Sequence, residues 1–166
     1  MPQYYKAAIL DGFELKVIKP SGESLLDQAM STDIKKIEKN IYKSPKKIVW
    51  AGDYCNNEIP NFPFSNKEIW ETKECELPLI KLELKNCILV NHSLRCYVPM
   101  DFFRKPSSKD EEYPHPLPLL TAYGNGLGSG GYYGYNRYFV GQWIGHVISV
   151  EDSDFAQRNN YVLLQD

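Results

Sequence analysis

A single helical stripe among short alternating apolar runs is the feature that most restricts the fold of this chain. Its apolar residues recur at spacings of four, four, three and four, which places them on one helical face. The stripe consists of Leu26, Met30, Ile34, Ile37 and Ile41. It predicts an amphipathic helix that packs on a sheet. Ser44-Pro45 ends this helix, and the side chains of residues 31–33 compete for backbone hydrogen bonds and can interrupt it.

Most of the remaining apolar runs are typical of β-strands. Asp11-Gly12 is a two-residue turn that β-hairpins prefer, and it lies between the runs 7–10 and 13–18. Phe13, Leu15 and Val17 alternate with charged residues, so we expect them to form the buried face of the second run. Further strands are expected at 47–50, 79–84, 87–91, 94–98, 119–123, 138–140, 143–144, 147–150 and 161–164.

Length and pattern together define the expected fold. A chain of 166 residues is within the usual range of one domain, and no linker or internal repeat divides it. We therefore expect a single domain over residues 1–166. Its fold class is α+β, with a mainly antiparallel, bent sheet and one main amphipathic helix packed on a face.

Charge and hydropathy exclude several classes of protein. The net charge is −2 and the pI is about 5.9, which argues against a nucleic-acid binder that neutralises many phosphates. The N-terminus lacks the charged and apolar regions of a signal peptide. No run approaches the roughly 20 apolar residues of a membrane helix. We expect a cytoplasmic protein with no membrane partner.

The four cysteines are expected to be reduced thiols, because a cytosolic domain of this size needs no disulfide. They are Cys55, Cys75, Cys87 and Cys96, and no two of them form a C-x-x-C knuckle. His92 does lie between Cys87 and Cys96 on adjacent expected strands. The sequence nevertheless predicts neither a metal site nor a cofactor.

The segment 124–134 is unusual because six of its eleven residues are glycine, which loses the most entropy on folding. Gly126, Gly128 and Gly131 match G-x-G-x-x-G, but no helix-forming residues follow, and no lysine occurs after position 109. A Rossmann or P-loop assignment therefore fails. Two interpretations stay open, namely a flexible loop or bulged hairpin, and a recognition loop.

Aromatic residues favour the recognition loop as the place to look for a ligand or partner. Tyr and Trp supply rigid contact area, and Arg accompanies them in interface hot spots; the same rings could stack on a base or a sugar. Tyr138 belongs to this group of rings. The candidate binding residues are Asn125, Gly126, Gly128, Tyr132, Tyr133, Tyr135, Arg137 and Trp143.

A second group of polar residues provides candidates for catalysis. Asp53 follows one expected strand, His92 ends another, and His115 lies in a proline-rich loop. A carboxylate and two imidazoles can form an acid–base or metal site if they converge. Each histidine alone is more often structural. Ser129 lacks the G-x-S-x-G elbow of a serine hydrolase.

Several stretches together resemble a group of small bacterial proteins that have no assigned function. They are 50–54, 89–92, 115–126, 140–144 and 147–151, and the similarity spans about residues 47–152. The residues 124–126 are the most distinctive, and Tyr133 stands where the group would have an acidic residue. The resemblance implies a bacterial or phage-borne protein and no catalytic residues.

These observations favour a non-enzymatic module that binds another protein, most concretely an immunity-type or inhibitor protein acting on a toxin or enzyme by surface complementarity. The acidic patches 110–112 and 151–154 belong to this hypothesis. The alternative is a small-ligand or nucleotide-binding protein or hydrolase that uses Asp53, His92 and His115 beside the 124–134 loop. An RNA-binding module is the third option, and the pI disfavours it.

Overall fold

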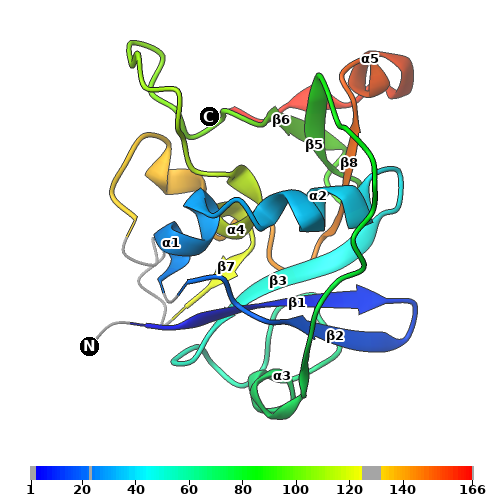
Figure 1. Ribbon diagram of the computed structural model, residues 1–166, viewed down its shortest axis with the longest axis vertical. Helices are drawn as coiled ribbons and strands as arrows, with labels where there is room; N and C mark the ends of the chain where they lie inside the picture. The colour runs from blue at the N-terminus through cyan, green and yellow to red at the C-terminus, as the bar shows by residue number, and fades with distance from the viewer. Residues whose placement is uncertain (1–2, 23, 125–131, 166) are drawn as a thin grey trace.

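The computed structural model describes residues 3–22, 24–124 and 132–165, and it has the predicted α+β class (Figure 1). The described residues form nine strands, five α-helices and one 3-10 helix. The strands are β1 (Tyr5–Asp11), β2 (Glu14–Ile18), β3 (Lys46–Gly52), β4 (Glu74–Cys75), β5 (Cys87–Asn91), β6 (Cys96–Pro99), β7 (Ala122–Tyr123), β8 (Val147–Asp152) and β9 (Val162–Leu163). The helices are α1 (Leu25–Met30), α2 (Ile34–Ile41), α3 (Asn66–Glu71), α4 (Pro116–Leu120), α5 (Phe155–Asn159) and the 3-10 helix η1 (Arg137–Phe139).

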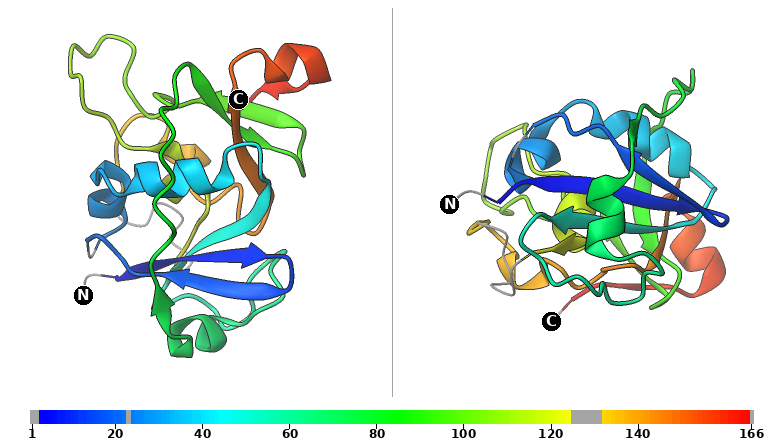
Figure 2. Two further views of the ribbon diagram at one scale, coloured as in Figure 1. Left: turned by 45° about the vertical axis from the view of Figure 1, so that its right-hand side comes forward. Right: turned by 90° about the horizontal axis from the view of Figure 1, so that it is seen from below.

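All nine strands belong to one open, mostly antiparallel sheet of order β4-β2-β1-β3-β8-β5-β6-β9. The pairs β2–β4, β3–β7 and β6–β9 are parallel, and the other pairs are antiparallel. β7 pairs with β3 beside the main path. The β1–β2 hairpin and the β5–β8 pair run in clearly different directions in both views (Figures 1 and 2). None of the helices in the described ranges is long and apolar enough to cross a membrane.

The N-terminal hairpin is confirmed, with its turn one residue later than expected. Asp11 pairs with Glu14, so Gly12 and Phe13 form the turn. Gly12 adopts a φ of +64°, which costs glycine little. Phe13 therefore lies at the tip of the hairpin, fully exposed to solvent rather than on the buried face. Val17 is buried as expected.

The central strands β3, β5 and β8 are buried on both faces, which explains their nearly continuous apolar sequences. Alternate residues of β3 enter different clusters: Trp50 packs on the side of α1, α2 and α4, and Val49 packs on the side of α3. A third, small cluster lies between β5 and α5. The cluster on the α3 side consists of Ala8, Val17, Val49, Ala51, Ile59, Phe62 and Ile69.

The expected single helix is two helices, α1 and α2. Ser24 begins α1 with a capping box that pairs it with Asp27, and α1 ends at Met30. The interruption at 31–33 resets the helical phase, so α2 buries Ile34, Ile37 and Ile41 while α1 buries Leu25, Gln28 and Ala29. Leu26 and Met30 of the predicted stripe are consequently exposed, at 42% and 41%.

Three predicted strands, 79–84, 138–140 and 143–144, are wrong, and a fourth, 119–123, is reduced to the two-residue strand β7. Residues 119–123 contain the end of α4 and the short strand β7, because Pro116 and Pro118 favour the first turn of a helix. Residues 138–140 overlap the 3-10 helix η1, and 143–144 form a turn. Residues 79–84 belong to an extended segment, 76–86, without strand pairing, which crosses α2 as a strap (Figure 1). Leu77 and Leu84 of this strap pack on the core, and Asn40 of α2 donates to the Pro78 carbonyl.

Candidate functional site

Some aromatic side chains of the tyrosine-rich region after position 131 are buried. The Tyr132 side chain is buried, and its hydroxyl donates to the Tyr135 carbonyl at 2.8 Å. Its ring meets Phe103 edge-on, with centroids 5.5 Å apart, and burial raises the pKa of Tyr132 to about 12. Trp143 is 0% exposed. Two of the predicted contact residues, Tyr132 and Trp143, therefore lie in the core rather than on a surface.

Other aromatic side chains of the same region face solvent. Tyr133 and Tyr138 are 78% and 77% exposed, and Tyr135 is also exposed. The Arg137 guanidinium lies over the Tyr138 ring, 4.9 Å from its centroid, and donates to the Tyr138 hydroxyl at 3.0 Å. This contact orders two long side chains against each other. We call Tyr133, Tyr135, Arg137 and Tyr138 the tyrosine platform.

The platform is fixed to the core from beneath. Asn136 adopts a left-handed conformation with a φ of +63°, and its side-chain amide donates to the Phe102 carbonyl at 2.8 Å. The buried Phe139 packs on Phe102 with ring centroids 5.1 Å apart. Gln142 donates to the Tyr138 carbonyl at 3.2 Å. The exposed rings are thus carried on an anchored backbone, which lowers the entropy lost when they make contacts.

A groove of about 420 Å³ adjoins the platform at Tyr135. Phe102 and Leu163 give it apolar walls, and Leu163 belongs to β9, the edge strand of the sheet. Arg104 and Lys105 place two cations on its lining, against the single carboxylate of Asp101. No sequence pattern marks these groove residues, because no regular spacing links the loop after β6 to the last strand.

Three of the predicted binding residues belong to the glycine-rich segment. Asn125, Gly126 and Gly128 lie outside the described residues. Gly124 follows β7, which pairs in parallel with β3, and Asp53 follows β3. Asp53 and the beginning of the glycine segment therefore lie at the same end of this strand pair.

Two buried polar atoms lie close to Gly124. A Cβ at this position would be 2.7 Å from the Tyr5 hydroxyl and 2.9 Å from Gln3 Oε1, so a larger residue would force one of these side chains to shift. Within the described residues neither oxygen has a hydrogen-bond partner. Burial, and secondarily Cys55 and Asp53, raises the pKa of Tyr5 to about 12. The Asp53 carboxylate itself accepts the Tyr4 backbone N–H at 3.1 Å.

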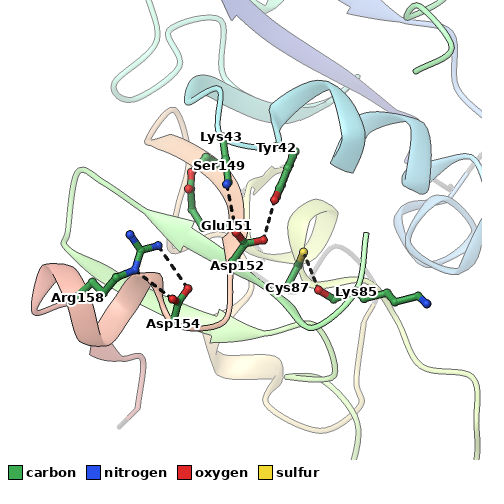
Figure 3. A network of polar contacts seen from close by, with 9 residues as sticks. All are labelled: Tyr42, Lys43, Lys85, Cys87, Ser149, Glu151, Asp152, Asp154 and Arg158. Carbon is green, nitrogen blue, oxygen red and sulfur yellow. Dashed lines mark hydrogen bonds and ion pairs between the residues drawn. The ribbon is translucent and has the colours of Figure 1, made fainter. Parts of the chain in front are cut away.

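His92 belongs to a chain of hydrogen bonds on the α5 side of the sheet. Its Nε2 lies 2.7 Å from Ser149 Oγ, and its Nδ1 lies 3.2 Å from the Tyr161 hydroxyl. Ser149 in turn donates to Glu151 at 2.6 Å, within β8 (Figure 3). Because the serine proton goes to Glu151, His92 Nε2 donates and Nδ1 accepts. Ser149 is fully buried, so its hydroxyl is inaccessible as a nucleophile.

His115 has a structural position between α2 and α4. Its Nδ1 accepts the Leu117 backbone N–H at 3.1 Å and caps α4, while its Nε2 lies 2.5 Å from Glu38 of α2. Across the described ranges, no hydrogen bond or ion pair joins any two of Asp53, His92 and His115. Each of the three candidate catalytic side chains thus has its own, separate partners.

The lowered pKa values of His92 and His146 lead us to expect a loss of stability in mild acid. Burial lowers the pKa of both below the ordinary 6.5, against an opposing charge from Glu151 at His92 and with help from Lys47 at His146. Between the lowered and the ordinary pKa the unfolded chain binds more protons, so stability is complete above pH 6.5 and falls as the pH drops below it. Protonation also breaks the 2.9 Å hydrogen bond from the Asn91 amide to His146 Nδ1.

Urea unfolding at a series of pH values from neutral downward tests this expectation. The double variant His92→Gln/His146→Gln should show a smaller pH dependence than the wild-type protein over the same interval. Equal slopes for the two proteins, or wild-type stability that rises on acidification, would contradict it.

In one of the two predicted acidic patches, 151–154, the acidic side chains are buried or interact with other residues of the same chain. Asp152 accepts the Tyr42 hydroxyl at 2.7 Å and pairs with Lys43 at 3.2 Å (Figure 3). The hydrogen bonds from Tyr42 and then Lys43 hold the pKa of Asp152 below its usual value. Asp154 pairs with Arg158, and Glu151 is buried. Residues 110–112, by contrast, are exposed.

All four cysteines are free thiols. Burial raises the pKa of Cys55 and of Cys96 to about 11, which makes both poor nucleophiles. Across the parts of the chain that the structure describes, no group of three His, Cys, Asp or Glu side chains could hold a metal ion. Comparison with protein-family models, with curated proteins and with solved structures found no match.

Proposed function

We propose that this protein is a non-enzymatic module that binds another protein through the tyrosine platform. The observation that carries the proposal is the high exposure of Tyr133 and Tyr138 on a backbone anchored in the core. Rings retained only for packing are buried, as Trp143 is. Exposed tyrosine next to arginine is the composition of interface hot spots, because both give large contact area and hydrogen bonds.

The charges around the platform define the partner chemistry. Arg137 lies in the platform, and Arg104 and Lys105 line the adjoining groove, with Asp101 as the opposing charge. A protein surface that presents carboxylates beside apolar groups complements this arrangement. The most concrete role is that of an immunity-type or inhibitor protein, which covers the functional surface of a toxin or enzyme.

The alternative of a ligand-binding protein or hydrolase has less support. It requires Asp53, His92 and His115 to act on one molecule. Each of them has its own hydrogen-bond partners, and His115 and Glu38 are engaged with each other. The platform needs no such convergence, because its residues are neighbours in the chain.

The triple variant Tyr133→Ala/Arg137→Ala/Tyr138→Ala tests the platform. Hot-spot truncations each weaken binding by about 2 kcal/mol, about 30-fold, so the triple variant should lose more than about 100-fold in affinity. Partners retained by the immobilised wild-type protein would be identified, produced and titrated by calorimetry. The triple variant should retain its wild-type melting temperature, because these side chains are exposed.

A matched control removes two exposed rings and one cation elsewhere. The variant Phe13→Ala/Tyr54→Ala/Lys67→Ala should bind the same partner with wild-type affinity. If the platform variant keeps its partner with unchanged affinity, the proposed surface is wrong. If the partner is an enzyme or toxin, its activity should fall when the wild-type protein is added.

A further inference from the structure

A cavity of about 240 Å³ is lined by residues of the β1–β2 hairpin, α1, α2, β3 and the strap, and none of its described lining residues belongs to the tyrosine platform. Its volume is below the roughly 300–1,000 Å³ of pockets for drug-sized ligands, so a small molecule is its fitting occupant. Its apolar lining comes from five elements of the fold. The apolar residues are Ala7, Ile18, Ile34, Ile37, Trp50 and Leu77.

The aromatic side chain of this cavity is held in one orientation. The Trp50 indole N–H donates to Gln28 Oε1 at 2.8 Å, and Trp50 is almost fully buried. Gln28 is itself fixed, since its Nε2 donates to the Tyr5 carbonyl at 2.8 Å and to the Gly22 carbonyl at 3.1 Å. A side chain with these contacts does not need to be ordered when a ligand binds.

The wall opposite α2 is also attached at both ends. β4 pairs with β2, and the Lys19 backbone N–H donates to the Cys75 carbonyl at 3.1 Å. Farther along the strap, Asn40 of α2 donates to the Pro78 carbonyl at 3.2 Å. The strap therefore closes one side of the cavity without strand pairing of its own beyond Cys75.

Charged residues of both signs line the mouth. Lys36 and Asp33 lie 3.9 Å apart and form a weak surface ion pair, since both side chains are more than half exposed. Lys19 and Glu76 also line the cavity, and within the described ranges neither of them has an ion-pair partner. The two remaining charges thus offer one cation and one anion to a bound molecule.

We propose that this cavity binds a small zwitterion with an apolar side chain, the chemistry of an aliphatic or aromatic amino acid. The apolar side chain packs on Trp50, Ile34 and Ile37. The carboxylate of the ligand faces Lys19, and its ammonium group faces Glu76. A purely anionic or cationic molecule gains one of these contacts and meets a like charge at the other, so the charge pattern selects for a molecule carrying both.

The test uses three probes with the same phenyl body, namely phenylalanine, phenylpropionate and phenethylamine. The reporter is the Trp50 indole N–H resonance in nitrogen-15 correlation spectra, assigned by removing the other two tryptophans in turn with Trp70→Phe and Trp143→Phe. Phenylalanine should shift this resonance saturably. It should bind at least about tenfold more tightly than either singly charged probe, since each loses one charge-assisted contact.

Variants of the mouth separate this site from the platform. Lys19→Glu and Glu76→Lys are exposed changes, and each should weaken phenylalanine binding by about tenfold or more. The matched control Lys67→Glu, on α3, should leave it unchanged. The platform variant should also bind phenylalanine normally. Equal affinity for the three probes, or no saturable shift of the Trp50 resonance, would overturn the proposal.

Discussion

Trp143→Ala is expected to lower the free energy of unfolding by about 3–5 kcal/mol, the usual range for truncating a large buried aromatic side chain. Trp143 is 0% exposed and belongs to the main core cluster. Its backbone is tied to the end of α4, because its N–H donates to the Leu120 carbonyl at 2.7 Å. The alanine variant leaves a cavity that this anchored backbone cannot collapse to fill.

Tyr138→Ala provides the comparison for this loss within the same segment. Tyr138 is 77% exposed, so its truncation should change stability by no more than about 0.5 kcal/mol. The conservative change Trp143→Phe should cost less than Trp143→Ala, because phenylalanine keeps an aromatic ring in the core and leaves a smaller cavity. Urea unfolding measures all three. Similar losses for Trp143→Ala and Tyr138→Ala would refute the assignment of inward and outward rings.

Gln28→Leu is expected to lower the free energy of unfolding by about 2–4 kcal/mol. The substitution keeps the side-chain volume similar but removes the hydrogen bonds to Trp50, Tyr5 and Gly22. A buried polar group left without its partner costs about 1–3 kcal/mol. Since these bonds join α1 to β1 and β3, their loss should loosen α1 first, which hydrogen exchange of its backbone amides would detect.

The same substitution on the surface is the control for this prediction. Gln142 is exposed and makes one hydrogen bond to the Tyr138 carbonyl, so Gln142→Leu should cost less than about 1 kcal/mol. A Gln28→Leu protein with wild-type stability would show that the buried amide network has little effect on folding. Retention of the Trp50 indole resonance at its wild-type position would lead to the same conclusion.

The sequence predicted strands well where alternation or apolar runs are bounded by turns. The first hairpin, β5, β6, β8 and β9 are all found close to their expected positions. The strand predicted at 79–84 was wrong. An extended strap that buries Leu77 and Leu84 over a helix has the same apolar pattern as a paired strand. The difference lies in backbone hydrogen bonding, which side-chain alternation does not report.

Helices were predicted less accurately, for local reasons. The stripe from Leu26 to Ile41 is consistent with one continuous helix, yet the break at 31–33 changes which residues face the core. A buried glutamine, Gln28, then occupies a core position that no apolar pattern marks. At α4 the prolines at 114, 116 and 118 indicated a loop, whereas His115 caps a helix that begins at Pro116.

The candidate site was located in part by the sequence. Ring-rich composition identified the segment, but composition does not tell an inward Tyr132 from an outward Tyr133, because both follow a glycine run without regular periodicity. The Trp50 cavity had no sequence signal, since its walls come from β1, β2, α1, α2, β3 and the strap, which are far apart in the chain. Such sites arise from tertiary packing alone.

The shared edge of β3 has a consequence for synthesis on the ribosome. One side of this strand pairs with β8 through Lys46 and Lys47 and with β7 through Trp50 and Ala51. Both partners are encoded far downstream, so a nascent chain that has emerged only as far as the strap carries β3 with one row of peptide groups open. The growing polypeptide is therefore prone to mispair at this central strand until β7 and β8 have emerged, and chaperone capture of the open edge during that interval would protect it.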